Sequence, residues 1–282
     1  MKKILFISIL LLLVCTSPVL AQERRALVIG IGQYEDSRWG NIHGDSDVDY
    51  VLEMLDAKGF KDIHVLRNSA ATKAAIVSSF QSMELSCRPG DRVYIHFSGH
   101  GQQITDTDGD EEDGFDEAWI PYDAHPYYSE SYKGGKHLVD DEVNWMLSGI
   151  KKRIGHSGRL LVVVDACHSG SSTRELDEAI VARGFDKKFV IPGKKPKRKA
   201  PADENWITIS ACQPYQVNWE VTEPSVGKLT WCLYRLRGQL GALSNDDLKD
   251  SITIIMQENP GPMSQTPMIT GNIDTESIKD IF

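Results

Sequence analysis

Three strongly apolar runs, separated by segments with helical periodicity, limit what this chain can fold into. They cover Arg25–Ile31, Arg92–Phe97 and Arg159–Asp165, the last of which reads RLLVVVD. Continuous apolar runs of this length are typical of parallel strands buried on both faces. Asp45–Lys58 and Thr72–Glu84 instead repeat apolar residues every three or four positions, as amphipathic helices do. We therefore expect an α/β domain with a mainly parallel central sheet and helices on both faces.

Weaker signals continue the same alternation toward the C-terminus. The strands expected in addition are Asp62–Leu66, Ala118–Pro121 and Trp206–Ala211, and the helices are Val139–Ile150, Lys228–Leu240 and Asp246–Glu258. There is no internal repeat. A chain of 282 residues with one continuous alternation is most economically read as a single domain.

The N-terminus has the pattern of a signal peptide. Lys2-Lys3 precedes the apolar run Ile4–Val14, and small residues follow before Gln22. We therefore expect residues 1–21 to be removed and the mature chain to be periplasmic or secreted. Val14 is larger than the small residue that normally precedes a lipidated cysteine, which argues against an anchor at Cys15. No later run approaches 18 apolar residues, so no transmembrane segment is expected.

The net charge of −9 argues against a nucleic-acid partner, because phosphate binding needs a basic face. The one basic run, Lys194–Lys199, is short and interrupted by proline, and it is typical of an exposed loop. Without the leader, the cysteines are Cys87, Cys167, Cys212 and Cys232. They could form two disulfides in any of three pairings, but a chain of this size does not need them for stability. We expect Cys212 and Cys232 to be buried thiols.

Reactive side chains follow two of the expected parallel strands. His100 lies just beyond Phe97, and Cys167 lies just beyond Asp165, each among small residues. Sites in open α/β sheets form outside the carboxyl ends of the strands, so the two can meet there although they are 67 positions apart (167 − 100). A catalytic thiolate needs a base within reach, and His100 would supply it.

The backbone N–H groups of Gly101 and Cys167 could stabilise the oxyanion that develops during attack on a carbonyl. The competing interpretation is structural, since a single cysteine after a strand is more often a small buried hydrophobe, and a single loop histidine is more often solvated. The two residues together leave these interpretations about equally supported on the residues alone.

Seven ordered motifs give the chain a resemblance to the metacaspase and orthocaspase branch of the caspase-like cysteine peptidases. They cover roughly 25–272. In chain order they read HFSGHG (96–101), TDTDGDEEDGFDEAWIPYD (105–123), VDDEVNWML (139–147), DACHSG (165–170), ITISACQPYQVNWE (207–220), GKLTW (227–231) and QTP (265–267).

The resemblance implies a caspase-like three-layer sandwich, with a large-subunit part at 22–183, a basic linker at 184–204 and a small-subunit part at 205–282. It implies that His100 is the general base and acid, and that Cys167 forms a thioester with the substrate. The family cleaves after Arg or Lys, and the positions that match its specificity pocket are Asp47, Ser98 and Asp165. A buried cationic side chain does need a paired carboxylate. For Asp47 the alternative is a carboxylate that stabilises a helix N-terminus.

The resemblance also implies a possible calcium site at Asp116, Asp140 and Asp141, and carboxylate oxygens suit this hard cation. A fourth ligand position of the family holds Arg174 here, which makes calcium dependence an open alternative to a solvated acidic loop. The spacing of Asp106, Asp108 and Asp110 imitates an EF-hand. However, Glu111 stands where that loop needs glycine, so an EF-hand is rejected.

A peptidase with this preference could cleave itself in the Lys194–Lys199 loop, because exposed loops are where nicking concentrates. The natural partners would then be proteins or peptides containing Arg or Lys, and the family suggests a monomer. One rival is a catalytically silent caspase-like scaffold, and another is a clan relative with a different specificity. A zinc site made by His96, His100, Cys167 and His168 is a further rival, but the glutamate of H-E-x-x-H is absent. We expect neither zinc nor a nucleotide.

Overall fold

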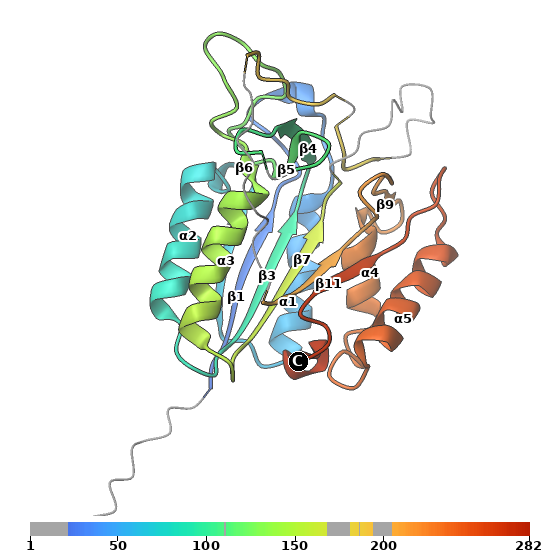
Figure 1. Cartoon of the computed structure of the whole chain (residues 1–282). Helices are drawn as coiled ribbons and strands as arrows, with labels where there is room; N and C mark the ends of the chain where they lie inside the picture. Colours follow the sequence, from blue (N-terminus) through green and yellow to red (C-terminus); the bar gives the residue numbers. More distant parts are fainter. Residues whose placement is uncertain (1–21, 110, 168–180, 186, 194–204) are drawn as a thin grey trace, which may run out of the picture.

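The computed structural model describes residues 22–109, 111–167, 181–185, 187–193 and 205–282. A six-stranded sheet in the order β11-β8-β7-β3-β1-β2 forms its centre (Figure 1). The strands β1, β2, β3, β7 and β8 run parallel, and β11 runs antiparallel at the edge beside β8. Their bounds are Arg24–Gly30, Asp62–Arg67, Arg92–Ser98, Arg159–Asp165, Ile207–Ser210 and Met268–Gly271 for β1, β2, β3, β7, β8 and β11. The expected α/β class is confirmed.

Helices cover both faces of the sheet, with α2 and α3 on one side and α1, α4 and α5 on the other (Figure 1). The side chains of strand β1 alternate between the two faces of the sheet. Leu27 and Ile29 pack in the core on the side of α2 and α3, and Ala26 and Val28 pack in the core on the side of α1, α4 and α5. The helices are α1 (Gly44–Ala57), α2 (Lys73–Ser86), α3 (Asp140–Ile154), α4 (Lys228–Arg235) and α5 (Asn245–Glu258). Three short 3-10 helices are η1 (Ser37–Trp39), η2 (Asn68–Ala70) and η3 (Ile278–Asp280).

Small antiparallel sheets lie beyond the carboxyl ends of the central strands. One contains β4 (Gly101–Thr105), β5 (Phe115–Trp119) and β6 (Leu138–Val139), and the other pairs β9 (Glu220–Val221) with β10 (Val226–Gly227). The strand expected at Ala118–Pro121 is β5, which begins and ends earlier than predicted. Strand β4 was missed, because its polar sequence GQQIT lacks the apolar run of a central strand.

The remaining predicted elements agree with the structure apart from their ends. Thr72 caps α2, where its hydroxyl accepts a hydrogen bond from the Ala75 amide. Helix α4 ends at Arg235, five residues before the predicted end at Leu240. No helix among the described residues is both long and apolar enough to cross a membrane. The expected signal peptide, Cys15, Asp110, His168, Arg174 and the Lys194–Lys199 loop lie outside the described residues.

Candidate active site

The ends of β3 and β7 bring the two expected catalytic residues to the same edge of the sheet. The strands pair in parallel register with Ser98 opposite Asp165. His100 and Cys167 each lie two residues beyond this pair, and both are buried. The register of the sheet therefore places His100 and Cys167 at neighbouring strand ends, although they are far apart in the sequence.

The His100 ring is held so that one nitrogen remains available as a base. Its Nε2 lies 3.4 Å from the Gly40 carbonyl oxygen, which can only accept, so Nε2 carries the hydrogen. Its Nδ1 is buried and has no hydrogen-bond partner among the described residues. Trp39 stacks on the ring, and burial lowers the pKa of His100 to about 4. The histidine is therefore neutral at pH 7 and can accept a proton.

The Cys167 thiol donates a hydrogen bond to the Gln216 carbonyl oxygen at 2.8 Å. Gln216 lies in the loop that follows β8, and the Cys212 thiol lies 3.5 Å from the same oxygen. All four described cysteines are thiols. The Cys167 sulfur is thus held against the loop that follows β8, in the small-subunit part of the chain.

A buried acidic cluster, called the acidic pocket below, lies beside the two candidate catalytic residues and contains the three expected pocket residues. Asp47 on α1, Ser98 at the end of β3 and Asp165 at the end of β7 are all fully buried. Their common neighbour is the guanidinium group of Arg183, which is also fully buried. The structure therefore brings together all three residues that the sequence proposed, around a cation supplied by the chain itself.

The Arg183 guanidinium donates hydrogen bonds from Nε and Nη1, whereas its buried Nη2 makes none among the described residues. Its Nη1 donates to Asp47 Oδ2 at 2.7 Å and to Ser98 Oγ at 2.5 Å. Its Nε donates to Glu220 Oε1 at 2.9 Å, and Nη2 lies 2.8 Å from the same oxygen. Asp165 is farther away, with Oδ1 3.6 Å from Nη1. Full burial of an arginine is tolerated only when such partners replace its water.

The two aspartates of the pocket differ in their hydrogen bonds and therefore in their pKa. Burial raises the pKa of Asp47 to about 6, although Arg183 opposes the change. Burial acts on Asp165 in the same direction. There it is outweighed by Arg183 and by hydrogen bonds from Asn218 and Thr230, so its pKa falls. The environment therefore favours the charged form of Asp165 more than that of Asp47.

A glycine leaves room for the guanidinium in this pocket. A Cβ on Gly227 would lie 2.3 Å from Asp165 Oδ2 and 2.5 Å from Arg183 Nη1. The same residue donates its amide to Asp47 Oδ1 at 2.8 Å. A side chain at this position would fill the space that the cation occupies.

Several residues of the site were not assigned by the sequence reasoning. Glu220, Asn218, Gln216, Gly227 and Thr230 all lie within motifs that were matched as stretches, so a signal existed but no role was given. Arg183 is the last residue of the expected large-subunit part, next to the expected linker, and nothing in its local sequence indicates burial. The amide of Gly101 has the position expected of an oxyanion donor, since it donates to a carbonyl oxygen, that of Arg183, at 3.2 Å.

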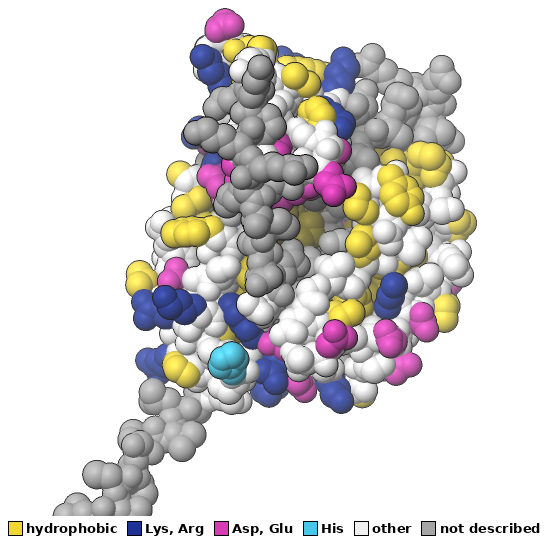
Figure 2. Space-filling view, in the orientation of Figure 1, with side chains coloured by type: hydrophobic (Ala, Val, Ile, Leu, Met, Phe, Trp, Pro, Cys, Tyr) yellow, Lys and Arg dark blue, Asp and Glu magenta, His cyan; other side chains and the backbone are white. Residues whose placement is uncertain are grey.

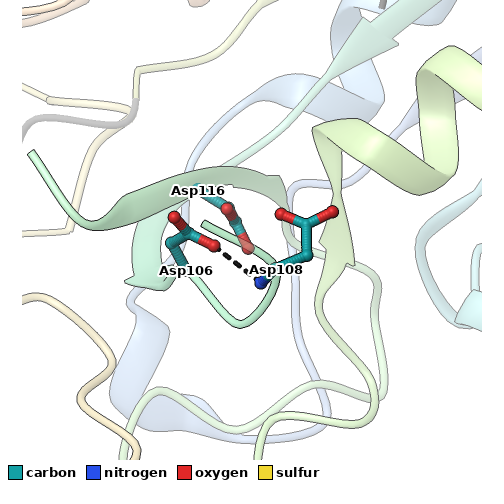
Figure 3. Close-up of side chains that lie close together, drawn as sticks. All are labelled: Asp106, Asp108 and Asp116. Carbon is teal, nitrogen blue, oxygen red and sulfur yellow. Dashed lines mark hydrogen bonds between the residues drawn. The ribbon is translucent and has the colours of Figure 1, made fainter. Parts of the chain in front are cut away.

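Acidic side chains gather in two groups beside the site. Asp106, Asp108 and Asp116 lie together, and the Asp108 amide donates to the Asp106 carboxylate at 2.8 Å (Figure 3). Asp140 lies with Glu111 and Glu117, with carboxylate oxygens within 4.8 Å of one another. The expected calcium ligands are thus divided between the two groups, with Asp116 in the first and Asp140 in the second. Asp141 belongs to neither, but its charge still acts on Asp140.

The Asp140 carboxyl is the most perturbed acid of the second group. Burial, followed by the charges of Glu117, Asp116 and Asp141, raises its pKa to about 8. Its Oδ1 is buried and has no hydrogen-bond partner among the described residues.

His96 was one of the residues of the alternative zinc site. Its ring nitrogens form hydrogen bonds with Tyr94 and Thr230.

A cleft of about 680 Å³ reaches Cys167 from the side of α3. Its lining includes the hydrophobic side chains of Trp119, Val164 and Trp206, and Glu111 and Asp113 are among its acidic residues. Figure 2 shows acidic side chains beside a hollow with hydrophobic side chains inside it. Cys167 therefore lines a cleft large enough for part of a peptide.

Comparisons with known proteins identify the family and the fold of the chain. The profile of the family described as metacaspase, peptidase C14 domain, matches residues 24–176. Metacaspase-1B of Aspergillus fumigatus is 35% identical over 160 residues, which are 53% of this chain and 36% of the relative. Metacaspase-1A of Neurospora crassa is 34% identical over 159 residues, which are 53% of this chain and 32% of the relative. The chain thus matches about a third of the length of these curated relatives.

Two solved structures show the same fold at low sequence identity. A crystal structure of a Geobacter sulfurreducens protein has a TM-score of 0.63 and 22% identity, and the match covers 88% of this chain and 92% of that one. Caspase-1 from Spodoptera frugiperda has a TM-score of 0.60 and 13% identity, with coverages of 89% and 87%. The fold is therefore caspase-like, as expected. With the family profile matched over more than half of its length, the chain belongs to the metacaspase family of peptidase C14 domains.

Proposed function

We propose that this protein is a cysteine endopeptidase that hydrolyses peptide bonds after Arg or Lys, with Cys167 as nucleophile and His100 as general base. The observation that carries this proposal is the pocket beside the two residues, which holds an arginine with Asp47, Ser98 and Glu220. A pocket whose carboxylate and hydroxyl oxygens pair with a buried guanidinium selects a basic side chain over an acidic or neutral one. The family membership supports the same conclusion.

The catalytic steps follow from the arrangement of the proton-carrying groups. The free Nδ1 of His100 takes the proton of the Cys167 thiol, and the sulfur attacks the carbonyl carbon of the bond to be cleaved. The Gly101 amide stabilises the negative oxygen, and the Cys167 amide is the proposed second donor. His100 then gives its proton to the departing amine. Water hydrolyses the resulting thioester, with His100 again acting as base.

The test is hydrolysis of three fluorogenic peptides that differ only in having Arg, Lys or Asp before the reporter group. We expect turnover of the Arg and Lys peptides, and a loss of at least about 1000-fold in kcat for Cys167→Ala and for His100→Ala. The proposal is wrong if the Cys167→Ala protein keeps its turnover. Absence of turnover in the wild type, with and without calcium, would instead favour the scaffold alternative. Turnover of the Asp peptide alone would favour a clan relative with another specificity.

We also propose that calcium binds at the acidic groups beside the cleft. The residues fit a hard cation, because the buried Asp140 oxygen lacks a partner and neighbouring carboxylates crowd it. Asp140, with Glu111 and Glu117, would hold the ion, and Asp116 and Asp141 lie close enough to add to the local negative charge. The ion would supply charge neutralisation and order the acidic loop.

The remaining elements of the proposal concern where the protein acts and on what. We propose export through residues 1–21, action on proteins or peptides with exposed Arg or Lys, and a monomeric state. Self-cleavage follows from the same specificity. The Lys194–Lys199 loop is one candidate for it and lies outside the described residues.

A further inference from the structure

Residues 181–184 cross the candidate active site as an extended segment. On one side Ala182 pairs antiparallel with Trp219. The Arg183 amide donates to the Asn218 carbonyl oxygen at 2.9 Å, and the Val181 carbonyl accepts from the Glu220 amide at 3.0 Å. Addition of a strand to an existing edge is a common way in which proteins bind peptides. The segment is therefore held by its main chain as a peptide ligand would be.

The other side of the segment meets the groups that would perform the chemistry. The Arg183 carbonyl oxygen accepts from the Gly101 amide at 3.2 Å, and Gly184 pairs with Gly101. The same carbonyl lies against the His100 ring, where it favours the protonated form. The bond between Arg183 and Gly184 thus lies at the base and the oxyanion donor.

A purely structural arginine would account for only part of this arrangement. Neutralising the pocket acids requires the guanidinium alone, and it does not require the following carbonyl to bind the oxyanion donor. The side chain, the main chain on the preceding side and the carbonyl are all in place together. This coincidence is expected of a substrate and is not needed for a structural ion pair.

We propose that Arg183–Gly184 is the bond that the protein cleaves in itself, and that residues 181–184 block the site until this bond is cut or the segment is displaced. This inference rests on the proposed function. The Cys167 sulfur forms a thioester with the Arg183 carbonyl carbon, the C–N bond to Gly184 breaks, and His100 protonates the new amine. Water then releases Cys167 and leaves a carboxylate on Arg183. Candidate cleavage in the Lys194–Lys199 loop is the rival outcome.

The test is incubation of the purified chain with and without calcium, followed by intact mass and N-terminal sequencing of any fragments. We expect a fragment that begins Gly184-Phe185 in the wild type and an intact chain in Cys167→Ala. Arg183→Lys should still be cut at this bond, because the pocket accepts both cations, and Arg183→Gln should not. Replacing the basic residues of 194–199 by serine should leave the cleavage unchanged. A first cut within 194–199, or equal cutting of Arg183→Gln, would overturn the proposal.

A second readout separates this proposal from the proposed function. Each preparation is also assayed with the Arg peptide, for which the wild type should show a lag that ends as the chain is cut. Wild type that hydrolyses the peptide without a lag and keeps the Arg183–Gly184 bond overturns the self-cleavage proposal alone. Arg183→Gln leaves three acids without their cation and could fold poorly, so the Arg183→Lys chain and the peptide Val-Ala-Arg-Gly-Phe provide independent checks. Failure to cut this peptide after Arg by an enzyme that cleaves other Arg peptides also contradicts the proposal.

A different observation concerns the pair Cys167 and Cys212. The two residues follow the neighbouring strands β7 and β8, which pair up to Val164 and Ser210. Both thiols use the Gln216 carbonyl oxygen, at 2.8 and 3.5 Å. The Cys212 thiol also hydrogen-bonds with Cys167, and this contact together with burial raises its pKa. A second thiol that touches the nucleophile is where an oxidised nucleophile would be captured.

We infer that Cys167 and Cys212 form a reversible disulfide when the protein meets hydrogen peroxide. The peroxide oxidises the Cys167 sulfur to a sulfenic acid and is reduced to water. The Cys212 thiol then attacks that sulfur, and a second water leaves as the disulfide forms. The disulfide removes the nucleophile and protects it from further oxidation. This inference needs the proposed function only for its activity readout, because the disulfide itself is detected by mass.

The experiment treats the wild type, Cys212→Ser and the matched control Cys87→Ser with hydrogen peroxide, blocks remaining thiols and maps peptides by mass. We expect a Cys167–Cys212 disulfide in the wild type and in Cys87→Ser, with activity restored by dithiothreitol. Cys212→Ser should be active before treatment but should lose its activity irreversibly, with Cys167 found as the sulfinic acid. Equal recovery in Cys212→Ser, or Cys167 found as the sulfinic acid in the wild type while Cys212 stays a thiol, contradicts the inference.

Discussion

At the scale of single residues, the pocket illustrates what sequence can and cannot supply. Ser98 and Asp165 follow strongly apolar strands, so their place at a sheet edge could be derived from the strand pattern and the resemblance. Glu220 could not be given a role, because its contact with the guanidinium depends on a loop folding back over the sheet. Arg183 was hidden for the same reason, since its partners lie at Asp47 and Glu220, far away in the chain.

Gly227 offers the sharpest test of the pocket at this scale. A Cβ there would overlap both the Asp165 carboxylate and the guanidinium, so Gly227→Ala should reduce kcat/KM for Arg peptides by about 100-fold through misplaced substrate. Gly238→Ala is the matched control, because no atom lies within 4 Å of its added Cβ. Circular dichroism and the melting temperature are measured to establish that both variants fold. Undiminished activity of a folded Gly227→Ala enzyme would show that the pocket does not bind the substrate side chain.

At the scale of elements, the sequence predicted the central strands and their helices better than the small sheets around them. Strand β7 was found with its observed ends, because a continuous apolar run can be buried only inside the sheet. Strand β4 was missed, since three of its five residues are polar and its partner β5 lies across a long acidic loop. The expected calcium ligands were therefore grouped from the family resemblance, and the hairpin of β4 and β5 that positions the acidic loop was not predicted.

The loop between β4 and β5, together with the start of α3, predicts a calcium effect on stability. At a calcium concentration about 100 times the Kd, binding should add about 2.7 kcal/mol. That raises the melting temperature by roughly 5–10 °C for a domain of this size. Asp140→Asn should lose most of this shift, because it removes the central carboxylate. The exposed Asp250→Asn on α5 should keep it. Differential scanning fluorimetry of Cys167→Ala backgrounds measures this without interference from cleavage, and equal shifts in all three proteins would refute the site.

At the scale of the whole molecule, both cores were predictable from the alternation of strands and helices, whereas the histidines buried within them were not. His96, His100 and His137 are buried, and burial is the main cause that lowers their pKa, to about 4, 4 and 3. Each stays neutral in the folded chain, while the unfolded chain takes up protons below about pH 6.5. Each therefore costs stability as the pH falls from 6.5 toward 4.

His137 isolates one such contribution. Its Nε2 lies 2.7 Å from Gln102 Oε1, which holds the neutral ring in place. Between pH 7 and pH 5 the Cys167→Ala protein should lose about 2 kcal/mol more of its unfolding free energy than the same protein with His137→Gln. Opposing contributions from Asp47 and Asp140 cancel in this comparison. Denaturant titrations at the two pH values measure the difference, with the exposed His156→Gln as control. An unchanged pH response in His137→Gln would show that His137 titrates normally.

The most direct test of the central claim compares two peptides that differ by one charge at one atom position. Arginine and citrulline have nearly the same shape, but citrulline is neutral and replaces one NH2 group by an oxygen. An acidic pocket at Asp47, Asp165 and Glu220 predicts that kcat/KM for a peptide ending in Arg exceeds that for the citrulline peptide by at least about 100-fold, and that both activities vanish in Cys167→Ala. Equal rates for the two peptides, or turnover that does not depend on Cys167, would contradict the account.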